Sequence, residues 1–417
     1  MVDLATTAPA RPGRMQRFAR QLLLRRMARL EHGTLEVHDA EGTLRFGQAA
    51  EEAGMCARIE VLHPQFWADA VFGGTAGAGE AYIHGLWKCD DLTALVRIMV
   101  SNRHVLEDVD GGATRLAALG RRIGHWLNRN SRDGSRRNIS AHYDLGNEFF
   151  RLFLDPTMNY SCGIFESPDA TMEQASIAKM EAICRKLDLR ADDHLLEIGT
   201  GWGALAIHAA RHYGCRVTTT TISREQHALA AERIRAAGLQ DRIELLLCDY
   251  RDLQGTYDKL VSVEMIEAVG HQYLDTYFKT CSRLLKPDGL MLLQGITIRD
   301  ELYEQALKAV DFIQRFVFPG GFIPSVAAMS ASLARSTDLQ LLHLQDIGLH
   351  YATTLKRWRT RFFANVDSVR ALGYPDSFIQ LWEYYLCYCE GGFLERNIGN
   401  VQMLLAKPRN RRPSLGY

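Results

Sequence analysis

The segment Glu197-Ile198-Gly199-Thr200-Gly201-Trp202-Gly203 carries three glycines at alternate positions. Glycine lets the backbone of a loop approach a ligand closely, and open α/β sheets bind ligands where such a loop joins a strand to a helix. A dinucleotide-binding loop has its third glycine one residue later, in the spacing GxGxxG. Glu197 precedes the loop, where a carboxylate can interact with an ammonium group. The loop therefore favours S-adenosylmethionine, with a binding set of Glu197, Gly199, Gly201 and Gly203.

Two further polar groups follow later strands of the same region. Thr221-Ile222-Ser223, with Gln226 after it, is a neutral set where an NAD enzyme would carry an acid for the ribose. Asp249-Tyr250-Arg251 follows the third strand and offers a carboxylate for an adenine amino group with a ring beside it. Asp249 could instead cap the helix that follows. Both groups extend the predicted cofactor site and weaken the interpretation as a dehydrogenase.

The elements that must position these residues alternate between strands and helices. Short apolar runs predict strands, and segments of helical length and period lie between them. This alternation predicts an α/β fold with a doubly wound, Rossmann-like parallel sheet. The predicted strands are 194–198, 215–220, 243–247, 259–263 and 290–296, and the predicted helices are 202–213, 223–237 and 272–285.

Composition limits the class of protein. The chain has 417 residues, of which 47% are apolar, so it can bury a full core and two domains are expected. Lys and Arg total 49, as do Asp and Glu, which excludes a globally basic nucleic-acid binder. The nine cysteines are scattered, which suits a reducing compartment. Cys387 and Cys389 form a CxC motif without a partner pair, so core packing explains them better than a metal site.

Two basic segments precede the α/β region. Residues 15–30 place apolar side chains on one stripe with arginines beside it, which predicts an amphipathic helix. Such a helix can lie among anionic lipid headgroups or pack on its own domain, and both interpretations stay open. Arg121 to Arg137 contains six arginines against one acid and is interpreted as part of an interdomain linker. Because no apolar run reaches about 18 residues, we expect a cytoplasmic protein, peripheral on the inner face of the membrane.

A series of motifs runs in order from about residue 138 to 405. Together they resemble the motifs of the cyclopropane fatty acid synthases, and Gly79-Glu80-Ala81-Tyr82-Ile83-His84-Gly85-Leu86-Trp87 is weakly similar to a further family signature. Any one motif could arise by chance, but this many in register identify the chain as a member. The motifs are His142-Tyr143-Asp144-Leu145-Gly146-Asn147-Glu148-Phe149-Phe150, Leu154-Asp155-Pro156, Asn159-Tyr160-Ser161-Cys162, Val263-Glu264-Met265-Ile266-Glu267, Asp311-Phe312-Ile313, Ile323-Pro324-Ser325 and Tyr351-Ala352-Thr353-Thr354-Leu355.

The resemblance implies a definite activity and domain plan. In this family a methyl group passes from S-adenosylmethionine to a cis double bond of a phospholipid acyl chain, and the carbocation then loses a proton from the new methyl to close a cyclopropane ring. The family's plan predicts a smaller N-terminal lipid-binding and dimerisation domain at 1–127, a basic linker at 128–137 and a class I methyltransferase domain at 138–417. Tyr160 and Ser161 are carried over as cofactor-binding residues.

The resemblance also implies a bound base. In the family a bicarbonate ion takes the proton, and its holders correspond here to Cys162, Glu267, Tyr351 and the backbone of Ile296. The fifth holder, a histidine in many members, is Gln294 in this chain. Glutamine can donate a hydrogen bond to an anion but cannot carry positive charge. The histidine that often follows the matching glutamate is also absent, since Ala268 stands there.

Those departures leave several outcomes open. If the base is weakened, a hydride shift would give a methylene or methyl branch in place of a ring. A small-molecule methyltransferase acting on an amine would share the cofactor loop but would not need Cys162, Glu267 and Tyr351 together. A non-enzymatic paralogue that binds lipid through residues 1–130 would account for Gln294 and Ala268.

Overall fold

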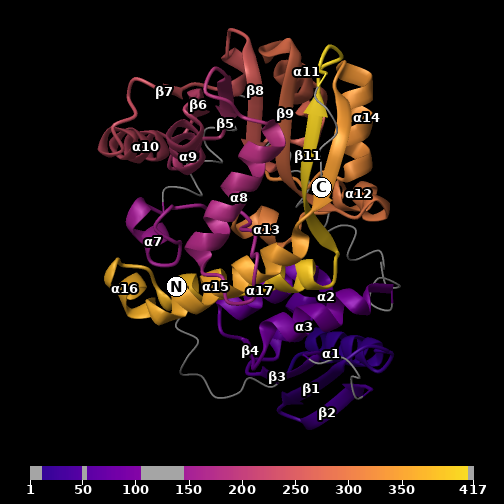
Figure 1. Cartoon of the computed structure of the whole chain (residues 1–417). Helices are drawn as coiled ribbons and strands as arrows, with labels where there is room; N and C mark the ends of the chain where they lie inside the picture. Colours follow the sequence, from indigo (N-terminus) through magenta and orange to yellow (C-terminus); the bar gives the residue numbers. More distant parts are fainter. Residues whose placement is uncertain (1–11, 49–53, 105–144, 412–417) are drawn as a thin grey trace. The chain divides into compact units, whose positions relative to one another are not determined.

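The computed structural model describes residues 12–48, 54–104 and 145–411, which fall into two compact units (Figure 1). Unit 1 takes its described residues from 1–127, 308–317 and 366–397. Unit 2 takes them from 128–307, 318–365 and 398–417. Each unit is therefore assembled from separate stretches of the chain.

Each predicted domain was a single continuous stretch of sequence, whereas each observed unit is not. The functions assigned to the predicted domains stay predictions. The stretches 308–317 and 366–397, which the plan places in the methyltransferase domain, group by their contacts with unit 1. The predicted linker 128–137, the basic stretch 121–137 and the motif residues 142–144 lie outside the described residues.

Unit 2 is built around a seven-stranded sheet in the order β10-β11-β9-β8-β5-β6-β7 (Figure 1). Neighbouring strands from β7 to β9 are parallel, whereas β11 is antiparallel to both of its neighbours. The five predicted strands and the parallel α/β sheet are confirmed; β10 and β11 were not predicted. The strands are β5 His194–Ile198, β6 Arg216–Thr221, β7 Ile243–Leu247, β8 Tyr257–Val263, β9 Leu285–Ile298, β10 Gln340–Asp346 and β11 Ile398–Ala406.

Helices cover both faces of this sheet. Successive side chains of a strand point to opposite faces, and on β9 Leu292 packs with side chains of α8 and α9, whereas Leu293 packs with those of α11 and α14. The three predicted helices correspond to α9, α10 and α11 and are confirmed. The helices are α7 Asn147–Arg151, α8 Met172–Leu187, α9 Ala204–Tyr213, α10 Arg224–Ala236, α11 Leu274–Leu284, α12 Asp300–Ala306, α14 Val326–Ser336 and α15 Gly348–Ala364.

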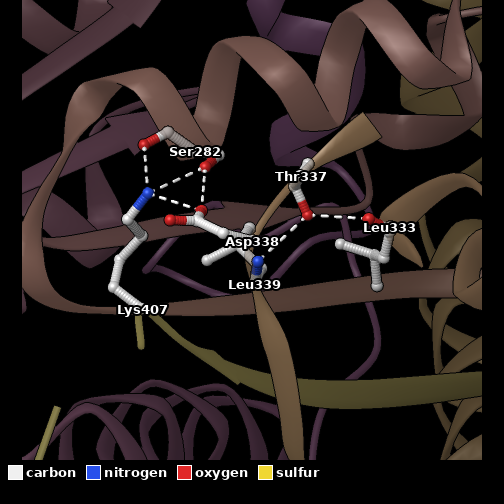
Figure 2. A network of polar contacts seen from close by, with 6 residues as sticks. All are labelled: Ser282, Leu333, Thr337, Asp338, Leu339 and Lys407. Carbon is white, nitrogen blue, oxygen red and sulfur yellow. Dashed lines mark hydrogen bonds and ion pairs between the residues drawn. The ribbon is translucent and has the colours of Figure 1, made fainter. Parts of the chain in front are cut away.

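A polar network holds the segment between α14 and β10 (Figure 2). Asp338 accepts a hydrogen bond from Ser282 Oγ at 2.8 Å and pairs with Lys407 Nζ at 2.6 Å. The hydroxyl of Thr337 donates to Leu333 O at 2.9 Å, which satisfies a carbonyl in the last turn of α14. The network thereby ties the start of β10 to the end of α11 and to the segment after β11.

Unit 1 combines a four-stranded sheet, in the order β2-β1-β3-β4, with helices from distant parts of the chain. Helix α17 packs against α2 and α3, and Thr93 of α3 donates to Glu390 of α17 at 3.1 Å. The elements are α1 Arg14–Met27, β1 Thr34–Asp39, β2 Gly42–Gly47, β3 Cys56–Val61, α2 Gln65–Ile83, β4 Trp87–Cys89, α3 Leu92–Ser101, α13 Phe312–Phe316, α16 Val366–Ala371 and α17 Asp376–Leu394.

The CxC motif lies within α17, where Cys387 is buried and Cys389 is partly buried. Both are free thiols on a helix rich in aromatic side chains, as the core-packing interpretation expects. Within the part of the chain that the structure describes, no group of three or more His, Cys, Asp or Glu side chains could hold a metal ion.

The predicted N-terminal helix is present as α1 and packs on α2. Ala19 and Met27 are buried in this packing, whereas Met15 and Phe18 are 57% and 60% exposed. Arg20 is held within the unit, since it pairs with Asp39 at 2.6 Å. The helix therefore packs on its own unit and still presents apolar side chains outward. Among the described residues, no helix is both long and apolar enough to cross a bilayer.

Candidate active site

The glycine loop joins β5 to α9 through three left-handed backbone positions. The φ angles are +102° at Gly199, +52° at Gly201 and +84° at Gly203, a region that residues with a Cβ seldom adopt. A Cβ on Gly199 would also come within 3.3 Å of Met265 Cβ. The loop therefore needs glycine at these positions, and it lies against the segment that follows β8.

Glu197 lies on β5 directly before this loop and is 3% exposed. Its Oε2 accepts a hydrogen bond from Thr219 Oγ1 on β6 at 2.5 Å. Burial raises the pKa of Glu197 to about 7, although the Thr219 hydroxyl acts in the opposite direction. A buried carboxyl of this kind fits the ammonium of S-adenosylmethionine, because a bound cation would favour its ionised form.

The neutral polar residues at the end of β6 and the start of α10 contact one another. Thr221 Oγ1 donates to Gln226 Oε1 at 2.8 Å and accepts from Ser223 N at 3.1 Å. Ser223 caps α10 by accepting from Gln226 N at 3.2 Å. Ile222, between them, is partly exposed. Their contact with a cofactor stays a prediction.

Asp249 follows β7 and caps the short helix Tyr250–Asp252, which was the alternative interpretation. Its carboxylate accepts from Arg251 N at 3.0 Å and is paired with the Arg251 guanidinium at 2.8 and 2.6 Å. The guanidinium also lies 5.6 Å from the centroid of the Tyr250 ring. All three predicted residues are therefore adjacent, but the carboxylate is already engaged, and its bond to adenine stays a prediction.

The predicted catalytic residues gather around a carboxylate that the sequence analysis did not select, that of Glu264. Its Oε1 accepts hydrogen bonds from three residues, and its Oε2 accepts one from a fourth residue. The donors are the Cys162 backbone N at 3.0 Å, Gln294 Nε2 at 2.8 Å, Asn400 Nδ2 at 2.7 Å and, on Oε2, the Tyr351 hydroxyl at 2.7 Å.

Glu267 forms a second carboxyl site beside the first. It lies in the short helix Ile266–Ala268, and its Oε1 accepts from Ile296 N at 2.5 Å. Gly295 permits this approach, because a Cβ there would meet Ile266 Cγ2 at 2.9 Å. Among the described residues, the buried Glu267 Oε2 has no hydrogen-bond partner. Burial, and then the charge of Glu264, raise the pKa of Glu267 to about 8, so its carboxyl is mostly protonated at neutral pH.

A relay of amides fixes the orientation of Gln294, which is fully buried on β9. Burial lowers the pKa of Lys186 to about 8, so at neutral pH its Nζ is mostly an ammonium, which can only donate, and it donates to Gln402 Oε1 at 2.6 Å. Gln402 must therefore present its amide nitrogen to Gln294, whose Oε1 accepts at 2.9 Å. As a result, the Gln294 nitrogen faces Glu264, where a donor is needed.

Cys162 binds the Glu264 carboxylate through its backbone N–H and not through its thiol. Its thiol donates to Gly163 O at 3.2 Å and to Ile347 O at 3.6 Å. Burial raises the pKa of this thiol well above its usual range, which keeps it protonated. The side chain therefore fills a buried niche, and the amide N–H is the group turned to Glu264.

A buried lysine of α8 binds the loop that contains the motif residues Asn159 to Cys162. Lys179 Nζ donates to Asn159 Oδ1 at 2.9 Å and to Ser161 Oγ at 3.0 Å. Burial lowers the pKa of Lys179. Tyr160 packs beside these groups, with its ring centroid 5.1 Å from that of Trp358. The predicted cofactor residues Tyr160 and Ser161 are thereby anchored next to Cys162.

Residues 130–403 match the family model described as mycolic acid cyclopropane synthetase. The chain belongs to this family. It is 38% identical over 338 residues to a tuberculostearic acid methyltransferase of Mycobacterium tuberculosis, covering 77% of this chain and 76% of that protein. It is 35% identical over 358 residues to a cyclopropane-fatty-acyl-phospholipid synthase of Escherichia coli K12, covering 84% of this chain and 88% of the other.

A solved structure of the mycolic acid cyclopropane synthase CmaA1, complexed with SAH and CTAB, superposes with a TM-score of 0.60. It is 32% identical, and the match covers 65% of this chain and 98% of that one. The predictions of the family, the α/β methyltransferase fold and S-adenosylmethionine as cofactor are confirmed. The chain is an S-adenosylmethionine-dependent methyltransferase of a family that methylates lipid acyl chains or their double bonds.

Bicarbonate, which family membership also implies, does not fit this arrangement of side chains. Three of its predicted donors, those of Cys162, Gln294 and Tyr351, bind Glu264. The fourth, Ile296 N, binds Glu267. Each of these donors therefore already has a hydrogen-bond acceptor, which is a carboxyl group of the protein itself.

Sequence reasoning missed Glu264, Asn400 and Lys179 as members of the site. For Glu264 a signal was present, since it is an acid at the carboxyl end of a parallel strand, where α/β sheets place their ligands. Asn400 lies on β11 and Lys179 on α8, and neither element was predicted.

Proposed function

We propose that this methyltransferase transfers the methyl group of S-adenosylmethionine to the cis double bond of an unsaturated acyl chain on a membrane phospholipid. The carbocation then loses a proton from the new methyl and closes a cyclopropane ring. The observation that carries the proposal is the convergence of four hydrogen-bond donors on one carboxylate beside the cofactor loop. An alkene is a weak, neutral nucleophile, so the site must supply alignment with the methyl and a base placed to act on the cation.

Different parts of the site would bind the cofactor and act on the acyl chain. The glycine loop and Glu197 would hold the cofactor's amino-acid end, and Gly199 lies against Met265, the neighbour of Glu264. The donated methyl and the carboxylate cluster are therefore expected in one reaction space. Tyr160 and Trp358, with ring centroids 5.1 Å apart, stand beside the same motif and provide faces that can stabilise a cation.

A second product is favoured by a specific observation. The tuberculostearic acid methyltransferase shares 38% identity with this chain, and Gln294, which cannot carry a positive charge, stands where the resemblance implies a histidine in many members. If the cation undergoes a hydride shift before it loses a proton, the product is a methylene-branched chain, which a later reduction would turn into a methyl branch. The methyl-transfer step is common to both outcomes.

Methyl-labelled S-adenosylmethionine and unsaturated phospholipid vesicles, analysed by mass spectrometry, test the proposal. We expect a gain of one CH2 per alkene. A gain that resists hydrogenation identifies the ring, and a gain that is hydrogenated identifies the methylene branch. Transfer only to small amines, with no labelled lipid, would overturn the proposal in favour of a small-molecule enzyme.

The membrane assignment belongs to this proposal as well. An acyl chain on a phospholipid is reached from the bilayer surface, and the exposed Met15 and Phe18 of α1 are apolar side chains on a helix with exposed arginines. We therefore propose a peripheral protein on the inner membrane face. A homodimer stays a prediction.

A further inference from the structure

The groups predicted to hold bicarbonate instead hold carboxyl groups of the chain. Glu264 receives three of these donors and Glu267 the fourth. A carboxylate presents the same planar pair of oxygens as bicarbonate. We propose that the Glu264 carboxylate is the catalytic base of this enzyme and takes the proton lost by the carbocation, so that no bicarbonate is required. This inference rests on the proposed function.

The two oxygens of Glu264 are engaged unequally. Oε1 accepts three hydrogen bonds, from Cys162 N, Gln294 and Asn400. Among the described residues, Oε2 accepts only that of Tyr351. Because a carboxylate oxygen has two lone pairs, Oε2 keeps one available for a proton. The residue as a whole is half-buried.

Hydrogen-bond donors are distributed unequally between the carboxyl groups of Glu264 and Glu267. Four donors surround Glu264, and hydrogen bonds donated to a carboxylate stabilise its ionised form. Glu267 receives one from the backbone of Ile296, and burial together with the charge of Glu264 raises the pKa of Glu267 to about 8. Glu267 is therefore mostly protonated at neutral pH, whereas the donors converge on the carboxyl group of Glu264.

The backbone at Glu264 is strained in a way that points to function. Its φ angle is +50°, in the left-handed region where a residue with a Cβ costs about 1 kcal/mol relative to glycine. Glycine would suit this backbone better. The side chain of the glutamate present there accepts hydrogen bonds from four donors, which is consistent with a functional role for the carboxylate at this strained position.

The proposed step balances without another reactant. After methyl transfer, a C–H bond of the new methyl breaks and its electron pair forms the third bond of the ring. The proton passes to Glu264 Oε2, so the carboxylate becomes a carboxylic acid. If a hydride shift comes first, the same transfer forms a methylene double bond. The acid returns its proton to water after the product leaves.

The test compares the wild type, Glu264→Gln and Glu264→Gly in buffers stripped of carbon dioxide and in buffers with added bicarbonate. We expect the wild type to methylate lipid equally in both. Glu264→Gln keeps the shape but not the base, so turnover should fall by about 100-fold or more in both buffers. Glu264→Gly frees the donors and the space, so its turnover should be low without bicarbonate and partly restored by it.

Two measurements separate loss of the base from loss of the fold. The affinity for S-adenosylmethionine, by calorimetry, should stay near the wild-type value in both variants, and thermal unfolding shows whether each variant is folded at the assay temperature. Asp188→Gly is the matched control, because Asp188 also has φ +50° but ends α8 and pairs with Arg190. It should show the wild type's indifference to bicarbonate.

The outcomes distinguish this inference from the proposed function. A wild type that methylates lipid only when bicarbonate is added overturns the inference and leaves the function intact. Wild-type turnover in Glu264→Gln would also overturn it. Absence of lipid methylation by the wild type in both buffers would instead overturn the proposed function.

Discussion

The amide nitrogen of Gln402 lies 2.9 Å from the amide oxygen of Gln294. Gln402 is itself oriented by Lys186, whose ammonium donates to its oxygen at 2.6 Å. Because the ammonium form of lysine, which predominates at neutral pH, cannot accept a hydrogen bond, it determines the direction of every bond in the relay. Gln294 must turn its nitrogen to Glu264. The residue that replaces the family's histidine is thus a donor of fixed orientation.

Gln402→Met should disrupt this orientation. The substitution leaves the buried oxygen of Gln294 without its donor, which costs about 1–3 kcal/mol of unfolding free energy. It also lets the Gln294 amide rotate, so turnover should fall while the affinity for S-adenosylmethionine is kept. Urea unfolding and lipid-methylation assays measure the two effects. Gln345→Met is the control, since exposed Gln345 also contacts Lys186 but not Gln294; equal losses in both variants would contradict the relay.

Binding of S-adenosylmethionine should release a proton from Glu197. Burial holds its pKa at about 7, so the group is partly protonated at neutral pH. The cofactor's ammonium would lower that pKa, and the affinity should therefore rise as pH increases through about 7. Calorimetry in buffers of different ionisation enthalpy counts the protons. Glu197→Gln should lose this release and bind about 10–100-fold more weakly, as expected for loss of a charged hydrogen bond; identical proton release in the variant would refute the assignment.

Glu267 should make the fold less stable at high pH. Its folded-state pKa of about 8 lies above that of an unfolded glutamate, near 4.3. The folded protein therefore binds more protons between these values, and stability falls as pH rises through this window, by at most about 1.4 kcal/mol per pH unit from this group. Denaturant titrations at pH 5 to 8 should give a flatter profile for Glu267→Gln. An unchanged slope would mean that Glu267 ionises normally.

The network around Asp338 should contribute measurably to stability. Asp338→Ala removes acceptors for Ser282 and Lys407, and Lys407 is only 12% exposed at its side chain. We expect a loss of about 1–2 kcal/mol in urea unfolding, because the partly buried ammonium loses its counter-ion. Asp192→Ala, at an exposed position, should change stability by less than about 0.5 kcal/mol. Equal effects of the two substitutions would argue against the network.

Vesicle binding should depend on the outer face of α1. Replacing Met15 and Phe18 with serine removes its most exposed apolar side chains and should weaken sedimentation with anionic vesicles. Cofactor affinity should not change.

Leu44→Ser, at a 41% exposed residue of unit 1, is the control. Arg20 is unsuitable for a charge-reversal test because it pairs with Asp39 and Glu41. Undiminished binding would remove α1 from the membrane proposal.

Local patterns were sufficient for much of the fold. Strands β5 and β7 match the predicted 194–198 and 243–247 because short apolar runs between turns and helices specify buried parallel strands. The glycine loop between a strand and a helix also followed from the local sequence, although the left-handed conformations of its glycines were not predicted. Contacts between residues that are far apart in the sequence could not be predicted from local patterns. Glu264 meets Asn400 at 2.7 Å across 136 positions of sequence, and β11 gives no local signal that its asparagine turns toward a carboxylate.

The composition of unit 1 from three stretches of chain has a consequence for biosynthesis. Helices α2 and α3 leave the ribosome early, but α17, which packs on both and supplies Glu390 to Thr93, is translated near the end. The apolar surfaces of α2 and α3 that α17 covers therefore stay exposed while most of unit 2 is translated. Nascent chains stalled before residue 376 should therefore bind chaperones through α2 and α3, and release should coincide with the emergence of α17.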